Sequence, residues 1–308
     1  MRGFVGLMQC DIDLLFSCFA RNNFGTVMTM TAPEIRRITD AGGLRGIEDL
    51  QRDVWGMPDR EIVPVHQLLT AVAAGGNVLG AFDHTGALLG FCYGLVGMRA
   101  GKFFFYSHMA GVRPGFQNHH IGFLLKRAQR QAALDQGLDW MMWTFDPLQG
   151  LNAAFNLRKL GATAHRYYVD YYGEMPDEIN RGMPSDRLEV DWWLRDPRVD
   201  AALTETAAPR TWPTVPAALR GIGRGEILMP EAPALDLAGP VIRIDIPRAI
   251  GELKANHPDI ALAWRLATRQ AFVYYFHRGY RAMDFVDQRS AATGSYILER
   301  QAGEGASV

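Results

Sequence analysis

The segment from Ser107 to Gly122 combines residue types that could bind an anion and move a proton. A strand pattern ends at Val112, a short loop containing Pro114 follows, and a helix pattern begins at Ile121. The first main-chain N–H groups of a helix have no intrahelical acceptors and lie at the positive end of its dipole. They can therefore hold phosphate oxygens without a basic side chain. The segment predicts an anion site, and Gly122 would let the anion come close.

Three histidines lie in the same segment. His108 comes four residues before the end of the strand pattern, and an imidazole with an ordinary pKa of about 6.5 can exchange protons near neutral pH. A hydrogen-bonded core histidine is the alternative for this residue. His119 and His120 are adjacent, so their side chains point apart, and no third residue has the spacing of a metal ligand. We expect loop histidines near a phosphate and no metal.

Apolar periodicity predicts the elements that must position this segment. Helices are expected over 43–55, 121–137 and 151–160, and strands over 78–82, 87–96, 102–112, 140–145, 162–172 and 188–194. Three antiparallel strands in a meander, then alternating helices and strands, indicate an α+β fold. Its mixed, mainly antiparallel sheet would be flanked by helices.

Composition divides the chain into a leader, a domain, a linker and an extension, at residues 1–30, 31–195, 196–239 and 240–308. The leader lacks a helix or strand period and is expected to be dispensable, with Met28 or Met30 as an alternative start. The linker is rich in alanine and proline. The extension predicts a strand over 241–246, a helix over 258–278 and a terminal hairpin. Its small size suggests that it packs on the first domain.

Composition and charge exclude several classes of function. The 308 residues include 32 Lys+Arg and 33 Asp+Glu, a formal net charge of -1, so no overall positive field would hold nucleic acid or an anionic membrane. The 3 cysteines show no metal or disulfide spacing, and no apolar run approaches the ~18 residues of a membrane span. We expect a cytoplasmic protein. The glycine motifs of dinucleotide-binding proteins, α/β-hydrolases and P-loop proteins are missing from the sequence.

The loop after the third strand of the meander resembles the pyrophosphate loop of the GNAT superfamily of acyl-CoA-dependent N-acyltransferases. Val112, Pro114, Gln117 and Gly122 match that loop position by position, whereas His120 stands where the family usually has glycine. The resemblance covers about residues 31–195. It implies a GNAT-like fold for these residues, and the small C-terminal strand, helix and hairpin extension predicted above follows them.

A second family signature, an Asn-x-x-Ala helix that ends in Lys-x-Gly, is similar to the segment from Asn152 to Gly161, with the asparagine offset by two residues. The resemblance implies that acetyl-CoA or another acyl-CoA is the co-substrate. Its binding residues would be Ala110, Val112, Gln117, Asn118, His119, His120, Ile121, Gly122 and Asn152.

The resemblance also implies direct transfer of the acyl group to an amine, which needs a base and an acid. His108 is the candidate base. Leu157 replaces the usual acid, a tyrosine, so Tyr106 or Tyr167 could serve, or water could protonate the thiolate. Asp146 could orient the acceptor amine, and the alternative for it is to cap the turn before Pro147.

Two charged pairs have an open interpretation. Asp186 and Arg187 could bind a substrate carboxylate or amine, although a surface turn is favoured. Arg265 and Arg269, one helical turn apart, are either surface charges, which we favour, or an anion clamp.

The first hypothesis for function is an N-acyltransferase, with acetyl-CoA as the expected donor, acting on a small-molecule amine or amino acid. The alternatives are a non-catalytic acyl-CoA-binding regulatory protein and a GNAT-fold enzyme with other acyl-CoA chemistry. No nucleic acid or membrane partner is expected, and a homodimer stays open.

Overall fold

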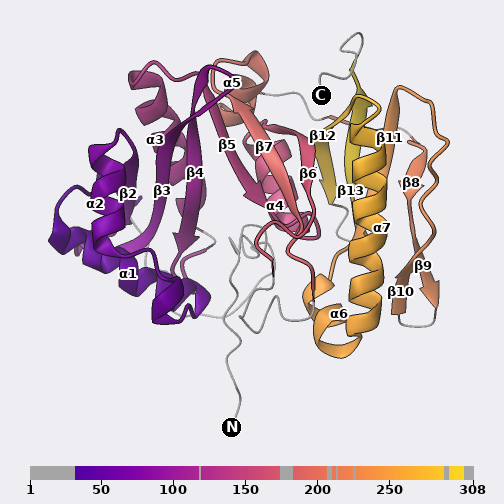
Figure 1. Ribbon diagram of the computed structural model, residues 1–308, viewed down its shortest axis with the longest axis horizontal. Helices are drawn as coiled ribbons and strands as arrows, with labels where there is room; N and C mark the ends of the chain where they lie inside the picture. The colour runs from indigo at the N-terminus through magenta and orange to yellow at the C-terminus, as the bar shows by residue number, and fades with distance from the viewer. Residues whose placement is uncertain are drawn as a thin grey trace, which may run out of the picture. The chain divides into compact units, whose positions relative to one another are not determined.

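The computed structural model describes residues 32–117, 119–173, 183–206, 210–212, 214–224, 227–287 and 291–301. The expected leader and Asn118 lie outside these ranges. The chain divides into two units, Met1–Met142 and Trp143–Val308, which are described one at a time (Figure 1).

The first unit is built on a sheet of strand order β1-β2-β3-β4-β5. Its neighbours are antiparallel except β4 and β5, which are parallel. Its elements are β1 (Glu34–Arg37), α1 (Ala41–Trp55), a 3-10 turn (Asp59–Glu61), α2 (Val65–Ala73), β2 (Asn77–Phe82), β3 (Leu88–Arg99), β4 (Lys102–Val112), α3 (Ile121–Asp135) and β5 (Trp140–Phe145).

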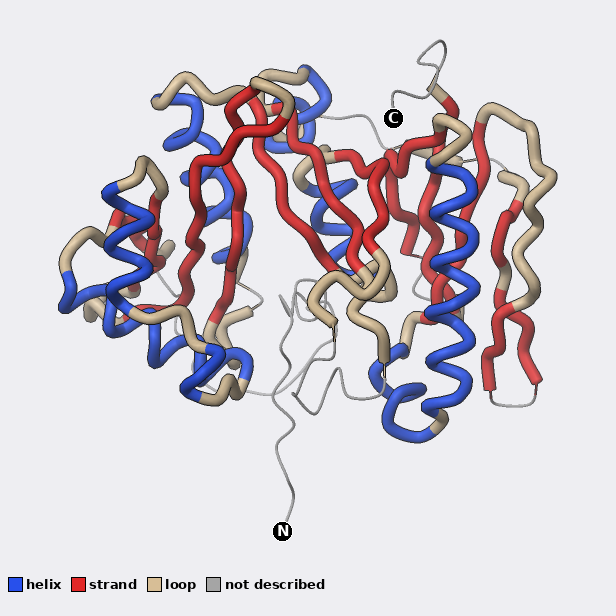
Figure 2. Tube along the Cα trace, viewed as in Figure 1, coloured by secondary structure: helices blue, strands red, loops and turns tan. Residues whose placement is uncertain are grey.

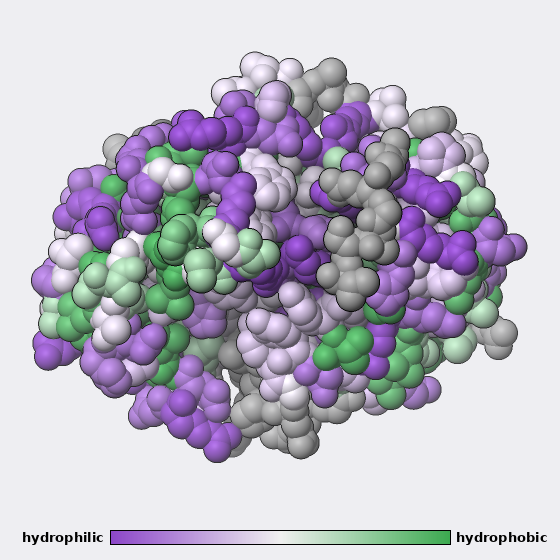
Figure 3. Space-filling model, turned by 45° about the horizontal axis from the view of Figure 1, so that its top comes forward, coloured by the Kyte–Doolittle hydropathy of each residue, from purple (hydrophilic) through white to green (hydrophobic). Residues whose placement is uncertain are grey.

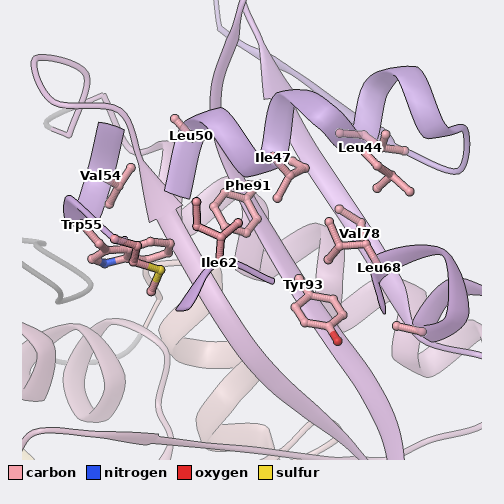
Figure 4. Close-up of a cluster of buried hydrophobic side chains, with 13 residues drawn as sticks. Leu44, Ile47, Leu50, Val54, Trp55, Ile62, Leu68, Val78, Phe91 and Tyr93 are labelled. Carbon is pink, nitrogen blue, oxygen red and sulfur yellow. The ribbon is translucent and has the colours of Figure 1, made fainter. Parts of the chain in front are cut away.

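Helix α1 covers one face of this sheet because its apolar residues recur at helical spacing. The Asp40 side chain accepts a hydrogen bond from the Gly43 N–H at 2.9 Å, which starts the helix, and Gly56 ends it with a φ of 62°. Figure 4 shows the apolar side chains of α1 directed at those of β3, where Phe91 and Tyr93 lie in the same buried cluster. The meander thus gains a core on this face.

Helix α3 packs on a second cluster of the sheet. Ile121 and Leu125 contact the buried Leu79, Ala81 and Leu89 of the first strands of the meander. Successive residues of a strand point to opposite faces, and Val78 and Phe91 belong to the α1 cluster whereas their neighbours Leu79 and Cys92 belong to the α3 cluster. The strand β4 is therefore held from both sides.

The second unit is built on a sheet of strand order β7-β6-β12-β13-β11-β8, in which β8 and β11 are parallel and the other described pairings are antiparallel. Figure 2 shows its long helix α7 and its strands by colour. Its elements are α4 (Gly150–Ala153), a π-helical turn (Ala154–Lys159), β6 (Thr163–Tyr168), β7 (Arg187–Trp193), α5 (Pro197–Leu203), β8 (Ala217–Leu219), β9 (Gly221–Arg224), β10 (Ile227–Pro230), β11 (Val241–Pro247), α6 (Ile250–Asn256), α7 (Pro258–Phe276), β12 (Tyr280–Asp287) and β13 (Thr293–Arg300).

The prediction of a mixed, mainly antiparallel sheet flanked by helices is confirmed. Several elements differ from expectation. Strand β1 and helices α2 and α6 were not predicted, and the segment expected to be a linker contains α5 and the short strands β8, β9 and β10. Strand β6 pairs with β12 through Ala164 and Ala282, so the last strands of the expected first domain share a sheet with the C-terminal strands. The expected boundaries at 195 and 240 remain predictions.

Some large apolar side chains remain exposed in each unit, as is normal for a folded protein, and Figure 3 shows hydrophobic groups among hydrophilic ones on one face. None of the helices within the described ranges combines the length and the apolar character that a membrane span requires.

Candidate active site

The N-terminus of α3 presents main-chain N–H groups beside open space. The first intrahelical bond runs from Leu124 N–H to the His120 carbonyl at 3.0 Å, so the N–H groups of Ile121 and Gly122 have no acceptor within the helix. Among the described residues, a Cβ placed on Gly122 would meet no atom within 4 Å outside its own helix backbone and chain neighbours. This is the arrangement that an oxygen-rich anion needs for close approach.

His120 precedes the helix in the left-handed conformation, with φ 56° and ψ 11°, and its side chain makes no capping hydrogen bond. L-residues rarely adopt this conformation, which costs a glycine little. The backbone therefore has the conformation that the usual glycine of the family would favour.

The described side chains of the loop differ in exposure. Gln117 is half-buried, and His119 and His120 are exposed. The loop is held by a turn, in which Phe116 N–H donates to the Arg113 carbonyl at 3.0 Å. Arg113 itself forms an ion pair with Asp53 of α1. The loop thus has a fixed start at the end of β4.

His108 lies in a β-bulge of β4. Tyr93 of β3 pairs with Met109 and Gly94 pairs with Ser107, so His108 is the extra residue. A bulge re-aims its side chain, and bulges are common beside active sites. The imidazole is exposed and lies between two rings, with centroids 5.7 Å from Tyr93 and 6.2 Å from Tyr106. Although one side of the residue is exposed, the neighbouring rings displace part of the water around the imidazole, which lowers the pKa of His108 and favours its neutral form.

Strand β4 extends beyond the short stretch over which it pairs with β5. In the described residues the two strands pair only through Phe105 with Met141 and Tyr106 with Met142. The side chains of Ala110 and Val112 pack on the α3 cluster. The strand thus runs from His108 to the α3 loop, so one continuous segment carries the candidate base and the anion site.

A buried polar cluster joins β4 to α3, and the sequence analysis did not find it. Lys126 Nζ donates to Ser107 Oγ at 2.7 Å, and Ser107 Oγ donates to Gln129 Oε1 at 2.7 Å. All three residues are buried. The available signal was the polar Gln129 within the apolar stripe of the helix, eight residues after Ile121.

Asp146, in the second unit, is paired with an arginine that is distant in sequence. Arg265 Nη1 and Nη2 donate to its two oxygens at 2.7 and 2.8 Å, and Leu148 N–H donates to Oδ1 at 2.9 Å. Burial would raise the pKa of this carboxyl, but the ion pair and hydrogen bonds with Arg265 outweigh it and lower the pKa to about 2. The carboxylate is therefore ionised, and Arg265 engages both its oxygens.

Arg265, Asp186 and Arg187 are not the surface residues that we favoured, and Arg269 is half-buried. Arg265 is 1% exposed and Asp186 is 0% exposed. Arg269 donates to both oxygens of Asp186 at 2.9 and 2.8 Å, and the Tyr167 hydroxyl donates to Oδ2 at 2.7 Å. Burial raises the pKa of Tyr167 well above its ordinary value, so this hydroxyl keeps its proton. Arg269 thus fixes α7 to the residue that precedes β7, and Arg265 fixes it to the turn at Asp146.

Two residues of the second family signature are also buried. Asn152 on α4 is 4% exposed, and its Oδ1 has no hydrogen-bond partner among the described residues. Leu157, at the position of the usual tyrosine, is fully buried in the π-helical turn. Apolar packing therefore explains a leucine at this position.

No protein-family model matches the sequence, and neither does any curated protein. Solved structures do match. A Desulfovibrio desulfuricans protein assigned to the GNAT family of acetyltransferases has 14% identity and a TM-score of 0.44, over 53% of this chain and 99% of that chain. Arabidopsis thaliana Naa50, solved with a bisubstrate analogue, has 14% identity and a TM-score of 0.41, over 52% and 98%.

A GCN5-related glucosamine N-acetyltransferase region of a fungal multi-domain β-N-acetylglucosaminidase has 18% identity and a TM-score of 0.30. That match covers 40% of this chain and 14% of the longer fungal chain. These likenesses are distant, so the assignment rests on the chain's own elements. From α1 to β7 the elements follow the order that the sequence analysis predicts, with α2 added, and this arrangement is consistent with a GNAT-like fold.

Proposed function

We propose that the protein is an acyl-CoA-dependent N-acyltransferase. The observation that carries this proposal is the continuity between the bulged His108 of β4 and the open N-terminus of α3. The first supplies a neutral base, and the second supplies donors for a pyrophosphate. No other described segment of the first unit combines the two features.

In the proposed complex the N–H groups at Ile121 and Gly122 bind the CoA pyrophosphate, with Gln117 and the loop histidines beside it. The pantetheine arm then runs along β4 near Ala110 and Val112. A main-chain N–H of this strand would polarise the thioester carbonyl, where negative charge develops during attack.

The acceptor amine attacks the thioester carbon, so a C–N bond forms and the C–S bond breaks. His108 removes the proton that the attacking nitrogen must lose, directly or through water. The leaving thiolate takes a proton from an acid or from solvent. Tyr106, whose ring lies beside His108, is the nearest candidate acid. We propose no proton transfer for Asp146 or Tyr167, since Arg265 and Asp186 engage their polar atoms.

The donor and acceptor classes follow from this chemistry. Acetyl-CoA is the first donor to test, and a small amine or amino acid is the proposed acceptor. A thermal-shift series with CoA and acyl-CoA thioesters tests the binding step, because a ligand at 100 times its Kd stabilises by about 2.7 kcal/mol. CoA release with a panel of amines tests transfer. No stabilisation by any thioester would contradict the proposal.

A second candidate is a non-catalytic acyl-CoA-binding regulatory protein. Leu157 favours it, because a fully buried leucine replaces the tyrosine that serves as acid in the family. Stabilisation by acyl-CoA without CoA release on any amine would support this candidate over the first.

A further inference from the structure

Two aromatic residues of β3 make closely similar contacts with different partners. Phe91 meets Trp55 with ring centroids 5.8 Å apart and an interplanar angle of 82°. Tyr93, two residues later on the same face, meets His108 at 5.7 Å and 82°. Both belong to the buried cluster against α1 and α2 (Figure 4). One contact joins two core residues, and the other joins the core to the exposed candidate base.

We propose that Tyr93 is a positioning residue that holds the imidazole of His108 in one orientation for proton transfer. The proposal rests on the proposed function, in which His108 is the base. Tyr93 itself would touch neither the thioester nor the amine.

The first support is that, among the described residues, only ring contacts restrain the orientation of the His108 imidazole. Among the described residues its imidazole has no hydrogen bond and no ion pair, and its ring contacts are with Tyr93 and Tyr106. Catalytic imidazoles are commonly oriented by a hydrogen bond to the ring nitrogen that does not react. Here the ring contacts take that place, and both nitrogens stay available.

The second support is that Tyr93 is fixed more firmly than the residue it contacts. Its side chain is 1% exposed and lies in the buried cluster against α1 and α2. Tyr106 is half-buried and its ring lies at 28° to the imidazole, so it covers a different side. The nearly perpendicular Tyr93 ring and the nearly parallel Tyr106 ring together limit rotation of the imidazole.

The third support is the bulge. Inserting one residue between the pairs Tyr93 with Met109 and Gly94 with Ser107 places His108 against Tyr93. The local backbone irregularity is thus what brings the exposed imidazole to the fixed ring.

The test compares three variants of the full chain with isotope-labelled histidine and uses a fourth, His108→Gln, to assign the signal of His108. The chain has 8 histidines, and the loss of one imidazole signal in His108→Gln assigns that of His108. Tyr93→Leu removes the ring from His108, Tyr93→Phe keeps the ring and removes the hydroxyl, and Phe91→Leu is the matched control. The readouts are the side-chain couplings and line width of His108, together with kcat and the KM for acyl-CoA.

In Tyr93→Leu we expect couplings averaged over several His108 orientations, with kcat lowered about tenfold or more and KM for acyl-CoA unchanged. Tyr93→Phe should have His108 couplings and a kcat like those of the parent protein, because it keeps the ring. Phe91→Leu should lower the melting temperature as Tyr93→Leu does, yet leave the His108 couplings and kcat as in the parent protein.

Two results overturn the proposal: His108 couplings in Tyr93→Leu equal to those of the parent, or equal losses of kcat in Tyr93→Leu and Phe91→Leu. Failure of the proposed function can be distinguished from failure of the positioning role of Tyr93. If the parent transfers no acyl group, the couplings still report whether Tyr93 holds the imidazole.

Discussion

Asp146 and Arg265 form a bidentate ion pair in the interior of the second unit, across 119 residues of sequence. The carboxylate lies just after β5 and the guanidinium lies on α7. Breaking a buried pair by removing one partner leaves an uncompensated buried charge, which is far more costly than removing an exposed pair. The pair therefore makes Asp146 a residue on which the stability of its unit depends.

We expect Asp146→Asn to lower the free energy of unfolding by about 3–5 kcal/mol. Urea denaturation measures this loss. Asp287→Asn is a matched control, because Arg248 donates to both oxygens of Asp287 at a more exposed position. Equal losses in the two variants would contradict the account.

The ion pair of Asp146 with Arg265 also predicts how the free energy of unfolding depends on pH. The pKa of Asp146 is lowered from 3.8 to about 2, so its contribution is present above about pH 4 and is lost as the pH falls through about 2. The contribution is about 2 kcal/mol. Unfolding free energies measured between pH 5 and pH 2 should fall less steeply in Asp146→Asn than in the parent, and parallel curves would refute the assignment.

His108 predicts the pH dependence of transfer. A base must be neutral to accept a proton, and the lowered pKa of His108 keeps it neutral below its ordinary value of 6.5. The acidic limb of kcat should therefore lie below pH 6.5. His108→Ala should remove this limb and lower kcat by roughly 10²–10⁴, with CoA affinity nearly unchanged. A destabilised but fully active variant would remove His108 from the mechanism.

His120→Gly should keep or raise stability, by up to about 1 kcal/mol, because glycine adopts the left-handed conformation of this position at little cost. Ala100→Gly is the control, since Ala100 has a φ of 49° in the β3–β4 turn, away from the loop. CoA affinity should be unchanged or improved in both. A large loss of affinity confined to His120→Gly would mean that the imidazole itself contacts the ligand.

Most of the fold of the first unit could be predicted because the apolar residues of its helices and strands repeat at the spacing typical of each element. Leu44, Ile47 and Leu50 repeat at helical spacing, and the predicted strand over 140–145 has the bounds of β5. Helix α2 was missed although Val65, Leu68, Leu69 and Val72 repeat in the same way, because it spans two and a half turns between prolines and glycines.

The loop could be located from sequence, but the contacts of the candidate residues could not. The bulge that brings His108 to Tyr93 depends on the pairing of β3 with β4, which a one-residue change of register would undo. Asp146 and Arg265 carry no local sign of each other, because only the folded sheet and α7 bring them together. An arginine within the aromatic stripe of a helix, as beside Trp264, was the one available hint of burial.

The central claim, that the N-terminus of α3 binds CoA through its main chain, is tested most directly by a pair of glycine variants. Gly122 and Gly251 are each the second residue of a helix, and each follows an isoleucine. A Cβ on either would meet no atom of the described residues within 4 Å outside its own helix backbone and chain neighbours. Neither Gly122→Val nor Gly251→Val should therefore lower stability appreciably.

The measurement is the Kd of CoA for the two variants and the parent by titration calorimetry, with melting temperatures on the same preparations. We expect Gly122→Val to weaken CoA binding at least tenfold, because its side chain occupies the space where the pyrophosphate approaches, and Gly251→Val to bind like the parent. Parent-like affinity in a folded Gly122→Val would contradict the account.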